Sequence, residues 1–215
     1  MITAHALEVR AGARLLMEDA TFRIAAGDRI GLVGRNGAGK TTLTRILAGE
    51  ALPAAGNVTR TGEVGYLPQD PRTGDLEVSA RDRILSARGL DDVVRRLRLA
   101  EARMGDPDPQ VAAKAMRRYA RADAELHASG GYAAEAEAAR LAASLGIEER
   151  LLAQPLGTLS GGQRRRVELA RILFSGAETL LLDEPTNHLD ADSIGWLRDF
   201  LRNYKGGLVV ISHDV

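Results

Sequence analysis

The segment "RIGLVGRNGAGKTTLTRILAG" (Arg29–Gly49) decides the fold, because it joins a short apolar strand, a glycine-rich loop and a helical stretch. Its centre, Gly34–Thr41, fits the spacing G-x-x-x-x-G-K-S/T. Glycines let backbone N–H groups curl around phosphate, and the helix that follows directs its positive end at the same charge. A glycine-rich turn can match this spacing by chance. The strand before it and the helix after it favour a phosphate-binding loop.

Different residues of this loop contact different parts of a magnesium-bound triphosphate. Lys40 can reach the outer phosphates, and the hydroxyl of Thr41 can ligate magnesium. We therefore expect a triphosphate with Mg²⁺ as the ligand of this loop. The residues of the motif expected to contact the phosphates are Gly34, Arg35, Asn36, Gly37, Ala38, Gly39, Lys40 and Thr41.

Two adjacent acids stand at the end of a second apolar run, in "TLLLDEPTNHLD" (Thr179–Asp190). Like charges repel, so such a pair is unfavourable unless a bound cation offsets the repulsion. Hydrolysis of a magnesium-bound triphosphate needs an acid that holds the coordination shell of the metal. It also needs a base that orients the attacking water. Asp183 suits the first role and Glu184 the second. An isolated Asp-Glu pair is commonly only a cap, but the phosphate loop earlier in the chain favours the catalytic role.

The stretch "LSGGQ" (Leu159–Gln163) precedes the helical "RRRVELARIL". Ser160 is a good helix N-cap, and Gly161 and Gly162 expose backbone N–H groups at the positive end of that helix. Taken alone, such a stretch is more often a helix start than a ligand site. Together with the two motifs above it predicts a second anion site, which a chain with one triphosphate needs only if that site faces the nucleotide of another molecule.

The composition limits the class of protein. The chain has 215 residues with 45% hydrophobic content, which suffices for one core or a core with a small subdomain. Its 29 basic and 29 acidic side chains cancel, so any affinity for nucleic acid must come from a local patch. The absence of cysteine excludes disulfides and fits a reducing compartment.

Targeting signals are not apparent in the sequence. The stretch "MITAHALEVR" lacks the basic and apolar regions of a signal peptide. No apolar run approaches the ~20 residues that cross a bilayer. We therefore expect a soluble, cytoplasmic protein without direct membrane insertion, which would serve a membrane only through a partner.

Strands and helices alternate along most of the chain, which predicts an α/β fold with a mainly parallel sheet. From Ser79 to Leu145 the composition turns helical instead. Apolar residues there follow two seams of 3-4 spacing on either side of "GDPDP", which predicts an antiparallel helical hairpin inserted into the sheet fold. The seam residues are Leu90, Val93, Leu97, Ala100 and Met104, then Ala112, Ala115, Tyr119, Ala122 and Leu126.

These motifs, in this order over nearly the whole chain, resemble the ATP-binding cassette (ABC) ATPase domains. Gln69 in "YLPQD" matches the Q-loop of that family, Asp190 the D-loop, and His213 in "ISHD" the switch histidine. The resemblance implies a sandwich of two domains, in which ATP on the phosphate loop of one is covered by Ser160–Gln163 of the other.

The resemblance also implies a role for each matched residue. Glu184 would polarise water and His213 would contact the γ-phosphate, so these two are the expected catalytic residues. Thr41, Gln69 and Asp183 would hold the metal. The cofactors that the resemblance implies are ATP and Mg²⁺. The remaining residues expected to contact nucleotide are Thr42, Ser160, Gly161, Gly162, Gln163 and Asp190.

The stretch "EPTNHLD" is similar to the hallmark of ABC-F proteins, twin-domain ATPases that act on the ribosome and include antibiotic-resistance factors. Their first domain carries a helical arm between Q-loop and signature, where the predicted hairpin (about residues 90–128) lies. Four basic residues at helical spacing could bind ribosomal RNA, or could simply form a solvated face: Lys114, Arg117, Arg118 and Arg121. The first helix of the hairpin adds Arg95, Arg96, Arg98 and Arg103.

The expected architecture is therefore an α/β P-loop NTPase of the ABC ATPase type, with an N-terminal antiparallel β-subdomain and an inserted helical subdomain that carries the arm hairpin. The expected parts are residues 1–78, 79–158 and 159–215. Two other functions stay open, namely the ATPase subunit of a membrane ABC transporter and a regulatory cassette with little turnover.

The chain departs from the family pattern in two places. ABC domains usually place an aromatic residue before the glycine of their first turn to stack on adenine, whereas Ala11 precedes Gly12 here. Arg10 and Arg14 are the candidates to stack instead. The chain also ends at Val215, directly after the switch histidine, so we expect it to be a piece of a longer protein with a second cassette.

Overall fold

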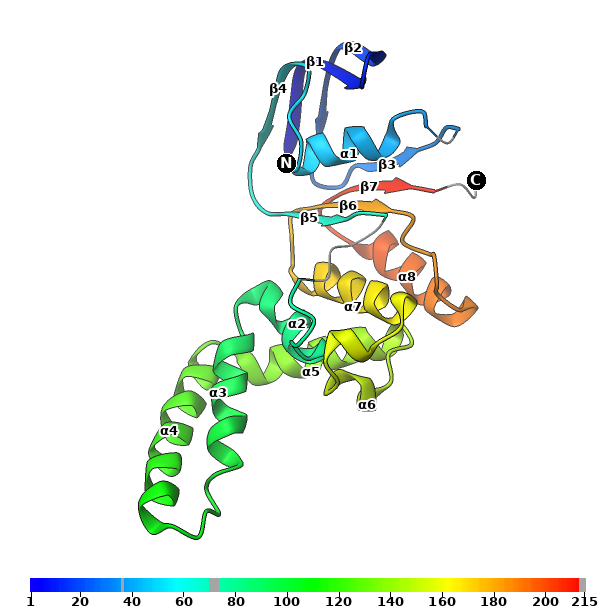
Figure 1. The fold of residues 1–215 in the computed structure, drawn as a ribbon. Helices are drawn as coiled ribbons and strands as arrows, with labels where there is room; N and C mark the ends of the chain where they lie inside the picture. Colours follow the sequence, from blue (N-terminus) through cyan, green and yellow to red (C-terminus); the bar gives the residue numbers. More distant parts are fainter. Residues whose placement is uncertain (36, 70–73, 213–215) are drawn as a thin grey trace. The chain divides into compact units, whose positions relative to one another are not determined.

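The structure is a computed structural model that describes residues 1–35, 37–69 and 74–212. Packing divides the chain into two compact units. The sheet unit comprises Met1–Arg72 and Ser175–Val215, and the helical unit comprises Thr73–Phe174. Figure 1 labels the elements of both units.

The sheet unit contains two sheets. One is parallel, as the alternation of strands and helices predicted, with the order β3-β7-β6-β5; its strands are β3 (Arg29–Leu32), β7 (Gly207–Ile211), β6 (Thr179–Asp183) and β5 (Val64–Leu67). The other is antiparallel, with the order β2-β1-β4; its strands are β2 (Arg14–Ile24), β1 (Ile2–Ala11) and β4 (Ala55–Arg60). Strand β6 is buried along its whole length between two neighbours, which explains its unbroken apolar sequence.

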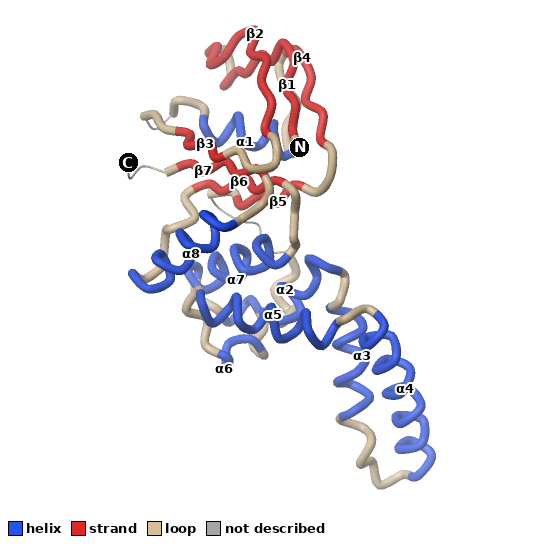
Figure 2. Tube along the Cα trace, turned by 180° about the vertical axis from the view of Figure 1, so that it is seen from behind, coloured by secondary structure: helices blue, strands red, loops and turns tan. Residues whose placement is uncertain are grey.

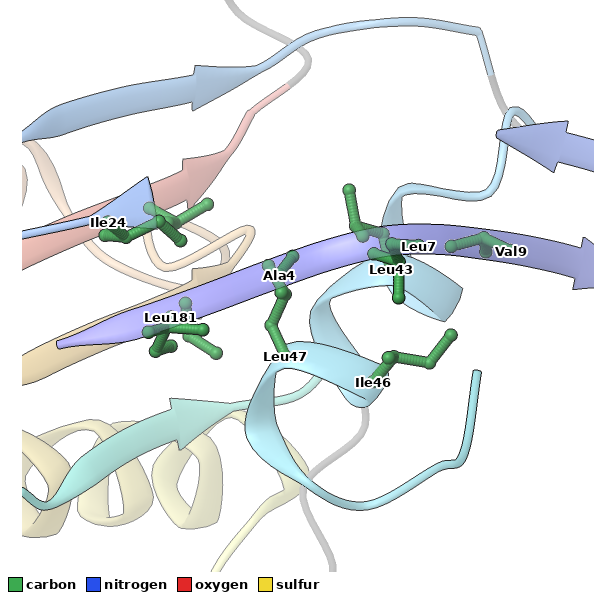
Figure 3. Packing of buried hydrophobic residues seen from close by; sticks show 10 residues of the cluster. Ala4, Leu7, Val9, Ile24, Leu43, Ile46, Leu47 and Leu181 are labelled. Carbon is green, nitrogen blue, oxygen red and sulfur yellow. The ribbon is translucent and has the colours of Figure 1, made fainter. Parts of the chain in front are cut away.

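Helix α1 (Lys40–Ala48) packs between the two sheets and joins them into one core. Leu43 and Leu47 lie against Leu7 and Ala4 of β1, as Figure 3 shows. Leu181 of β6 belongs to the same buried cluster. Because α1 directly follows the glycine-rich loop, this packing fixes the position of that loop. On the opposite face of the parallel sheet lies α8 (Ala191–Asn203) (Figures 1 and 2).

The carboxyl end of α1 is held by β4, a strand that the sequence analysis did not identify. The guanidinium of Arg60 donates to the carbonyl oxygens of Leu47, at 2.6 Å, and Ile46. Strand β4 begins "AGN", and glycine and asparagine are depleted in strands, so its sequence carried little strand signal. Its pairing with β1 is a long-range contact that local patterns do not reveal.

The helical unit is built from six α-helices and two short 3-10 turns among its described residues. The α-helices are α2 (Ala80–Leu85), α3 (Asp91–Glu101), α4 (Pro109–Ala128), α5 (Gly131–Ser144), α6 (Glu149–Leu152) and α7 (Gly161–Phe174). The 3-10 turns are η1 (Ser86–Arg88) and η2 (Leu156–Thr158).

Helices α3 and α4 form the predicted antiparallel hairpin, and they lie side by side in Figures 1 and 2. Most residues of the two predicted seams are buried, among them Val93, Leu97 and Ala122. The hairpin turns at "GDPDP", where the carboxylate of Asp108 accepts a hydrogen bond from the N–H of Gln110 at 2.8 Å and so caps α4.

Helix α7 packs inside the helical unit, against α2 and α5. Its Glu168 is 2% exposed and accepts hydrogen bonds from Arg83 and Arg171, which offset the cost of burying the carboxylate. By packing, residues 159–174 therefore group with the helices, whereas the sequence analysis placed them with the nucleotide-binding core. The sequence-based boundaries at 78/79 and 158/159 stay a prediction.

We expect Leu47→Ala to lower the free energy of unfolding by about 2–5 kcal/mol, because it removes a fully buried side chain from the contact between α1 and β1. Urea unfolding followed by circular dichroism measures this loss. Leu52→Ala is the matched control, since Leu52 is 92% exposed and its loss should change stability by less than about 0.5 kcal/mol. Equal losses for the two variants would contradict the packing role of α1.

Candidate nucleotide-binding site

The carboxyl ends of the parallel strands meet around one cavity of about 470 Å³. In open α/β sheets this edge is where ligands bind. The phosphate loop follows β3, and Gln69 follows β5. Asp183 ends β6 with Glu184 directly after it, and Ile211 ends β7. The lining residues are Ala11, Gly37, Ala38, Gly39, Lys40, Thr41, Thr42, Gln69, Asp183, Glu184 and Ile211. The cavity thus brings together two motifs that are far apart in the sequence.

The glycine-rich loop has the backbone that an anion cradle needs. Gly37 and Gly39 have φ of 76° and 94°, in the left-handed region that favours glycine. Lys40 bridges the loop, because its ammonium donates to the carbonyl oxygens of Gly34, at 2.6 Å, and Arg35, at 3.1 Å. The described first turn of α1 holds no acidic side chain, and Gly39 provides no side-chain cap. The positive end of the helix therefore faces the cavity.

The acid pair is buried at the floor of this cavity. Asp183 is 2% exposed and Glu184 is 6% exposed. The Thr41 hydroxyl donates to the Asp183 carboxylate at 2.8 Å, which ties the loop helix to β6. Glu184 has a left-handed backbone with φ of 48°, and its N–H donates to the carbonyl of Ile211 at 3.0 Å. Non-glycine residues rarely adopt this backbone, and such strain often marks a functional site.

Behind the loop, Thr44 and Tyr66 form a supporting layer that the sequence analysis missed. The buried hydroxyl of Thr44 donates to the carbonyl oxygens of Lys40 and Thr41, at 3.2 and 3.1 Å. Burial raises the pKa of the Tyr66 hydroxyl, and the nearby charges of Glu50 and Asp183 raise it further, against the lowering effect of Thr44 and Arg45. Tyr66 is therefore a neutral group near Asp183. A threonine within a helix was the only local signal for this layer.

The other predicted site residues are more scattered. Gln69 is exposed and lines the cavity. Asp190 caps α8, because its carboxylate accepts from the N–H of Ser193 at 2.8 Å. Asn36 and His213 lie outside the described residues.

The "LSGGQ" stretch forms a capping box at the start of α7. The Ser160 hydroxyl oxygen accepts from the N–H of Gln163 at 3.2 Å, and the Gln163 side-chain oxygen accepts from the N–H of Ser160 at 2.8 Å. Ser160 and Gly161 are exposed. A Cβ added at Gly161 would meet no described atom within 4 Å, and its φ is not left-handed. The described structure therefore gives no internal reason for glycine at position 161.

The oxygen donors of the cavity fit a magnesium ion. Mg²⁺ prefers carboxylate, hydroxyl and amide oxygens and keeps several waters. Asp183, Thr41 and Gln69 supply one oxygen type each, and the first two are already in contact. Among the described residues no cluster of three or more histidine, cysteine, aspartate or glutamate side chains suits another metal.

The predicted basic residues of the arm lie along α4. Lys114, Arg118 and Arg121 line a groove of about 650 Å³ between α3 and α4, whereas Arg117 is exposed but lies outside the groove lining. Arg103 lines the groove from the segment after α3. The groove also has an apolar part, formed by Leu99, Ala100, Val111 and Ala115.

Two acids near these cations have hydrogen-bond partners of their own, although Glu125 also acts electrostatically on Arg121. Glu125 pairs with Arg96 at 2.8 Å, and Asp123 accepts a hydrogen bond from the Tyr132 hydroxyl. In the part of the chain that the structure describes, the four predicted basic side chains of α4 form no ion pair and no side-chain hydrogen bond. The groove therefore keeps its positive charge.

A fold with a glycine-rich loop before α1, a buried acid pair after the parallel strand β6 and a serine-capped helix α7 defines an ATP-binding cassette of the P-loop class. The family model described as "ABC transporter" matches residues 17–187, and the chain belongs to this family. It is an ATP-binding cassette domain, and its similarity to ABC-F proteins is confirmed by the curated relatives that it matches.

The chain is 38% identical over 223 residues to the tylosin resistance ATP-binding protein TlrC of Streptomyces fradiae, covering 99% of this chain and 39% of the relative. It is 37% identical to the energy-dependent translational throttle protein EttA of Haemophilus influenzae, covering 94% of this chain and 36% of the relative. It is 36% identical to ABC transporter F family member 4 of Arabidopsis thaliana, covering 99% of this chain and 30% of the relative. The chain thus spans well under half of the length of each of these relatives.

A solved structure confirms the fold class. A dimeric ATP-binding cassette in a post-hydrolysis state, bound to ADP and Pi, superposes with a TM-score of 0.64. The two chains are 19% identical, and the superposition covers all of this chain and 88% of the solved one. In the described part of the chain, no helix combines the length and the apolar character that a bilayer crossing requires.

We expect Thr41→Val to weaken ATP binding about 10-fold when Mg²⁺ is present, because valine keeps the shape of threonine but loses the hydroxyl that contacts Asp183. Fluorescence titration with a labelled ATP, with Mg²⁺ and with EDTA, measures the effect. The variant should match the wild type in EDTA. Thr59→Val, on exposed β4, serves as the control and should match it in both buffers. An equal loss in Mg²⁺ and EDTA would contradict the metal role of Thr41.

Proposed function

We propose that this chain binds ATP with Mg²⁺ and hydrolyses it to ADP and phosphate when it is paired with a second cassette. The observation that carries the proposal is the cavity in which Lys40 and Thr41 of the phosphate loop meet the buried Asp183 and Glu184. Backbone N–H groups and Lys40 neutralise the phosphates there, and a buried carboxylate is held close by for the water.

Each residue of the cavity has a distinct part in this proposal. Thr41, Asp183 and Gln69 would hold Mg²⁺, which supplies charge for the outer phosphates. Glu184 accepts hydrogen bonds from the attacking water and orients it, since it is the buried acid next to Asp183. Its strained backbone and its bond to Ile211 fix the carboxylate beside β7, whose sequence continues to His213. His213 would contact the γ-phosphate.

In this proposal, the capping box at the start of α7 contacts the nucleotide that the second cassette holds. Ser160 and Gly161 are exposed, and a glycine with no internal constraint leaves room for another molecule to approach the backbone. The helix start is positively polarised, so a phosphate of a nucleotide held by another cassette is the ligand that it suits. Gly162, Gln163 and Asp190 would lie at the same interface. The dimeric ATP-binding cassette described above supports this assembly by analogy.

We expect Glu184→Gln, in a protein that joins this chain to a second cassette, to keep ATP affinity and to slow turnover roughly 10²–10⁴-fold, the range for a lost general base. Phosphate release and ATP binding are measured in parallel. Glu178→Gln is the matched control, because Glu178 belongs to the same unit and its side chain is 65% exposed. The isolated chain should bind ATP and hydrolyse it poorly. Unchanged turnover in Glu184→Gln would refute the role of this residue.

We further propose an ABC-F role, in which the cassette acts in the cytoplasm on the ribosome and the α3–α4 hairpin contacts RNA. The groove between α3 and α4 supports this, because phosphates match its unpaired cations and nucleobases match its apolar part. The names of TlrC and EttA, which mention tylosin resistance and translation, support roles in antibiotic resistance or translation.

Arm binding should depend strongly on salt. If Arg103, Lys114, Arg118 and Arg121 each contact a phosphate, log affinity should fall with log salt at a slope of roughly −3. Replacing the three α4 groove residues with alanine should bring the slope to about −1, while Arg117→Ala, outside the groove, should change it least. Ribosome co-sedimentation across a salt series measures this. A wild-type slope near zero would discard the RNA contact.

The two other functions give different outcomes in the same assay. A transporter subunit would sediment with membranes that contain its permease, and not with ribosomes. A regulatory cassette would bind ATP without measurable turnover even in the wild-type two-cassette protein. Ribosome binding by the Glu184→Gln protein in the presence of ATP would separate the ABC-F role from both.

A further inference from the structure

The nucleotide cavity has a phosphate end and a second end at the β1–β2 hairpin. Phosphates belong at the start of α1, and the γ-phosphate belongs beside Asp183 and Glu184. Strand β1 runs along α1 from Ala4 near Leu47 to Leu7 near Leu43 (Figure 3), so its last residue lies beyond the amino end of the helix. That residue, Ala11, lines the cavity. A nucleotide held by the loop therefore places its base against the hairpin.

The register of the hairpin decides which side chains face this base. Ala11 itself lines the cavity, so its face of β1 is the cavity face. The ladder is regular here, because the last register shift lies between Val9 and Arg10. Arg14 lies directly opposite Ala11 in the β1–β2 ladder, and directly opposed residues share a face. Leu16, near this position, contacts the phosphate loop, since its side chain lies within 2.3 Å of a Cβ built on Gly39.

Arg10 is directed away from this base position. It pairs with Leu15 in the ladder, and Leu15 is 41% exposed. The Arg10 guanidinium is also bound to the Glu8 carboxylate at 2.5 Å. Among the described residues Arg14 forms no ion pair and no side-chain hydrogen bond, and it is exposed. Of the two arginines that the sequence allowed, the geometry selects Arg14.

We propose that Arg14 binds the nucleotide base by stacking its guanidinium on the purine face, over the small Ala11, and that the site does not distinguish adenine from guanine. A guanidinium plane stacks on an aromatic face whichever groups the ring edge carries. Ala11 and Leu16 offer no hydrogen-bonding side chain to read that edge. The base therefore adds affinity without selectivity, and the site accepts purine nucleoside triphosphates as a class. This inference rests on the proposed function of nucleotide binding.

The test is competition binding with ATP, GTP and inorganic tripolyphosphate on the 215-residue chain. The wild type should bind ATP and GTP with affinities within about 3-fold of each other. Arg14→Ala should weaken both nucleotides about 5- to 20-fold, the effect of a lost cation–π contact, and leave tripolyphosphate unchanged. Arg10→Ala, on the opposite face of the hairpin, is the matched control and should match the wild type with all three ligands.

A second variant tests the position of the base. In Arg14→Ala/Ala11→Tyr, an aromatic ring enters the cavity at Ala11 and should restore nucleotide affinity, since an aromatic ring stacks on a base as a guanidinium does. Thermal unfolding confirms that each variant is folded. Unaltered ATP affinity in Arg14→Ala would overturn the inference, as would ATP bound far more tightly than GTP.

The remaining outcomes separate this inference from the proposed function. A parallel loss of tripolyphosphate binding in Arg14→Ala would show that Arg14 acts on phosphates, and it would overturn the base contact alone. A wild-type chain that binds neither ATP nor tripolyphosphate would overturn the proposed function and this inference together.

Discussion

The structure depends on the packing of α1 between the two sheets. The helix buries Leu43 and Leu47 against β1 and the parallel sheet, while Arg60 of β4 holds its carboxyl end. Its amino end is then fixed at the edge where β6 ends, and the contact of Thr41 with Asp183 closes the arrangement. A helix end attracts phosphate through partial charges whose effect falls off within one turn, so the position of the helix end relative to the cavity matters. The core supplies that placement.

The same packing explains why two buried acids are tolerated at the end of β6. Asp183 receives a hydrogen bond from Thr41, and Tyr66 nearby stays neutral because burial raises its pKa. Asp183 therefore has a hydroxyl donor and a neutral phenol beside it, and both acids line the cavity that the start of α1 also lines. This surrounding favours a cation and an anionic phosphate together, and it disfavours an isolated negative charge.

Sequence patterns predicted those parts of the site that depend on local chemistry. Three features each predict the backbone around them from local sequence alone: the glycine spacing, the acids after "TLLL" and the serine before α7. The structure places the first two around one cavity. The missed parts depend on contacts between distant segments. Strand β4 exists because β1 pairs with it, Thr44 supports the loop from behind, and the orientation of Arg14 follows from a ladder register. Composition and periodicity contain no information on such pairings.

Charge illustrates the same limit at the level of the whole chain. The formal net charge is zero, which suggests no attraction to nucleic acid. In the hairpin, however, Glu125 and Asp92 bind arginines at the base of α3, and Asp123 binds a tyrosine. Exposed ion pairs of this kind contribute at most about 1 kcal/mol to stability. Their greater effect is on the location of charge. Glu125 acts on Arg121 as well as on Arg96, but the described lining of the groove contains only basic charged side chains. A balanced sequence can therefore fold into a locally basic groove, and side-chain pairing decides where the net field lies.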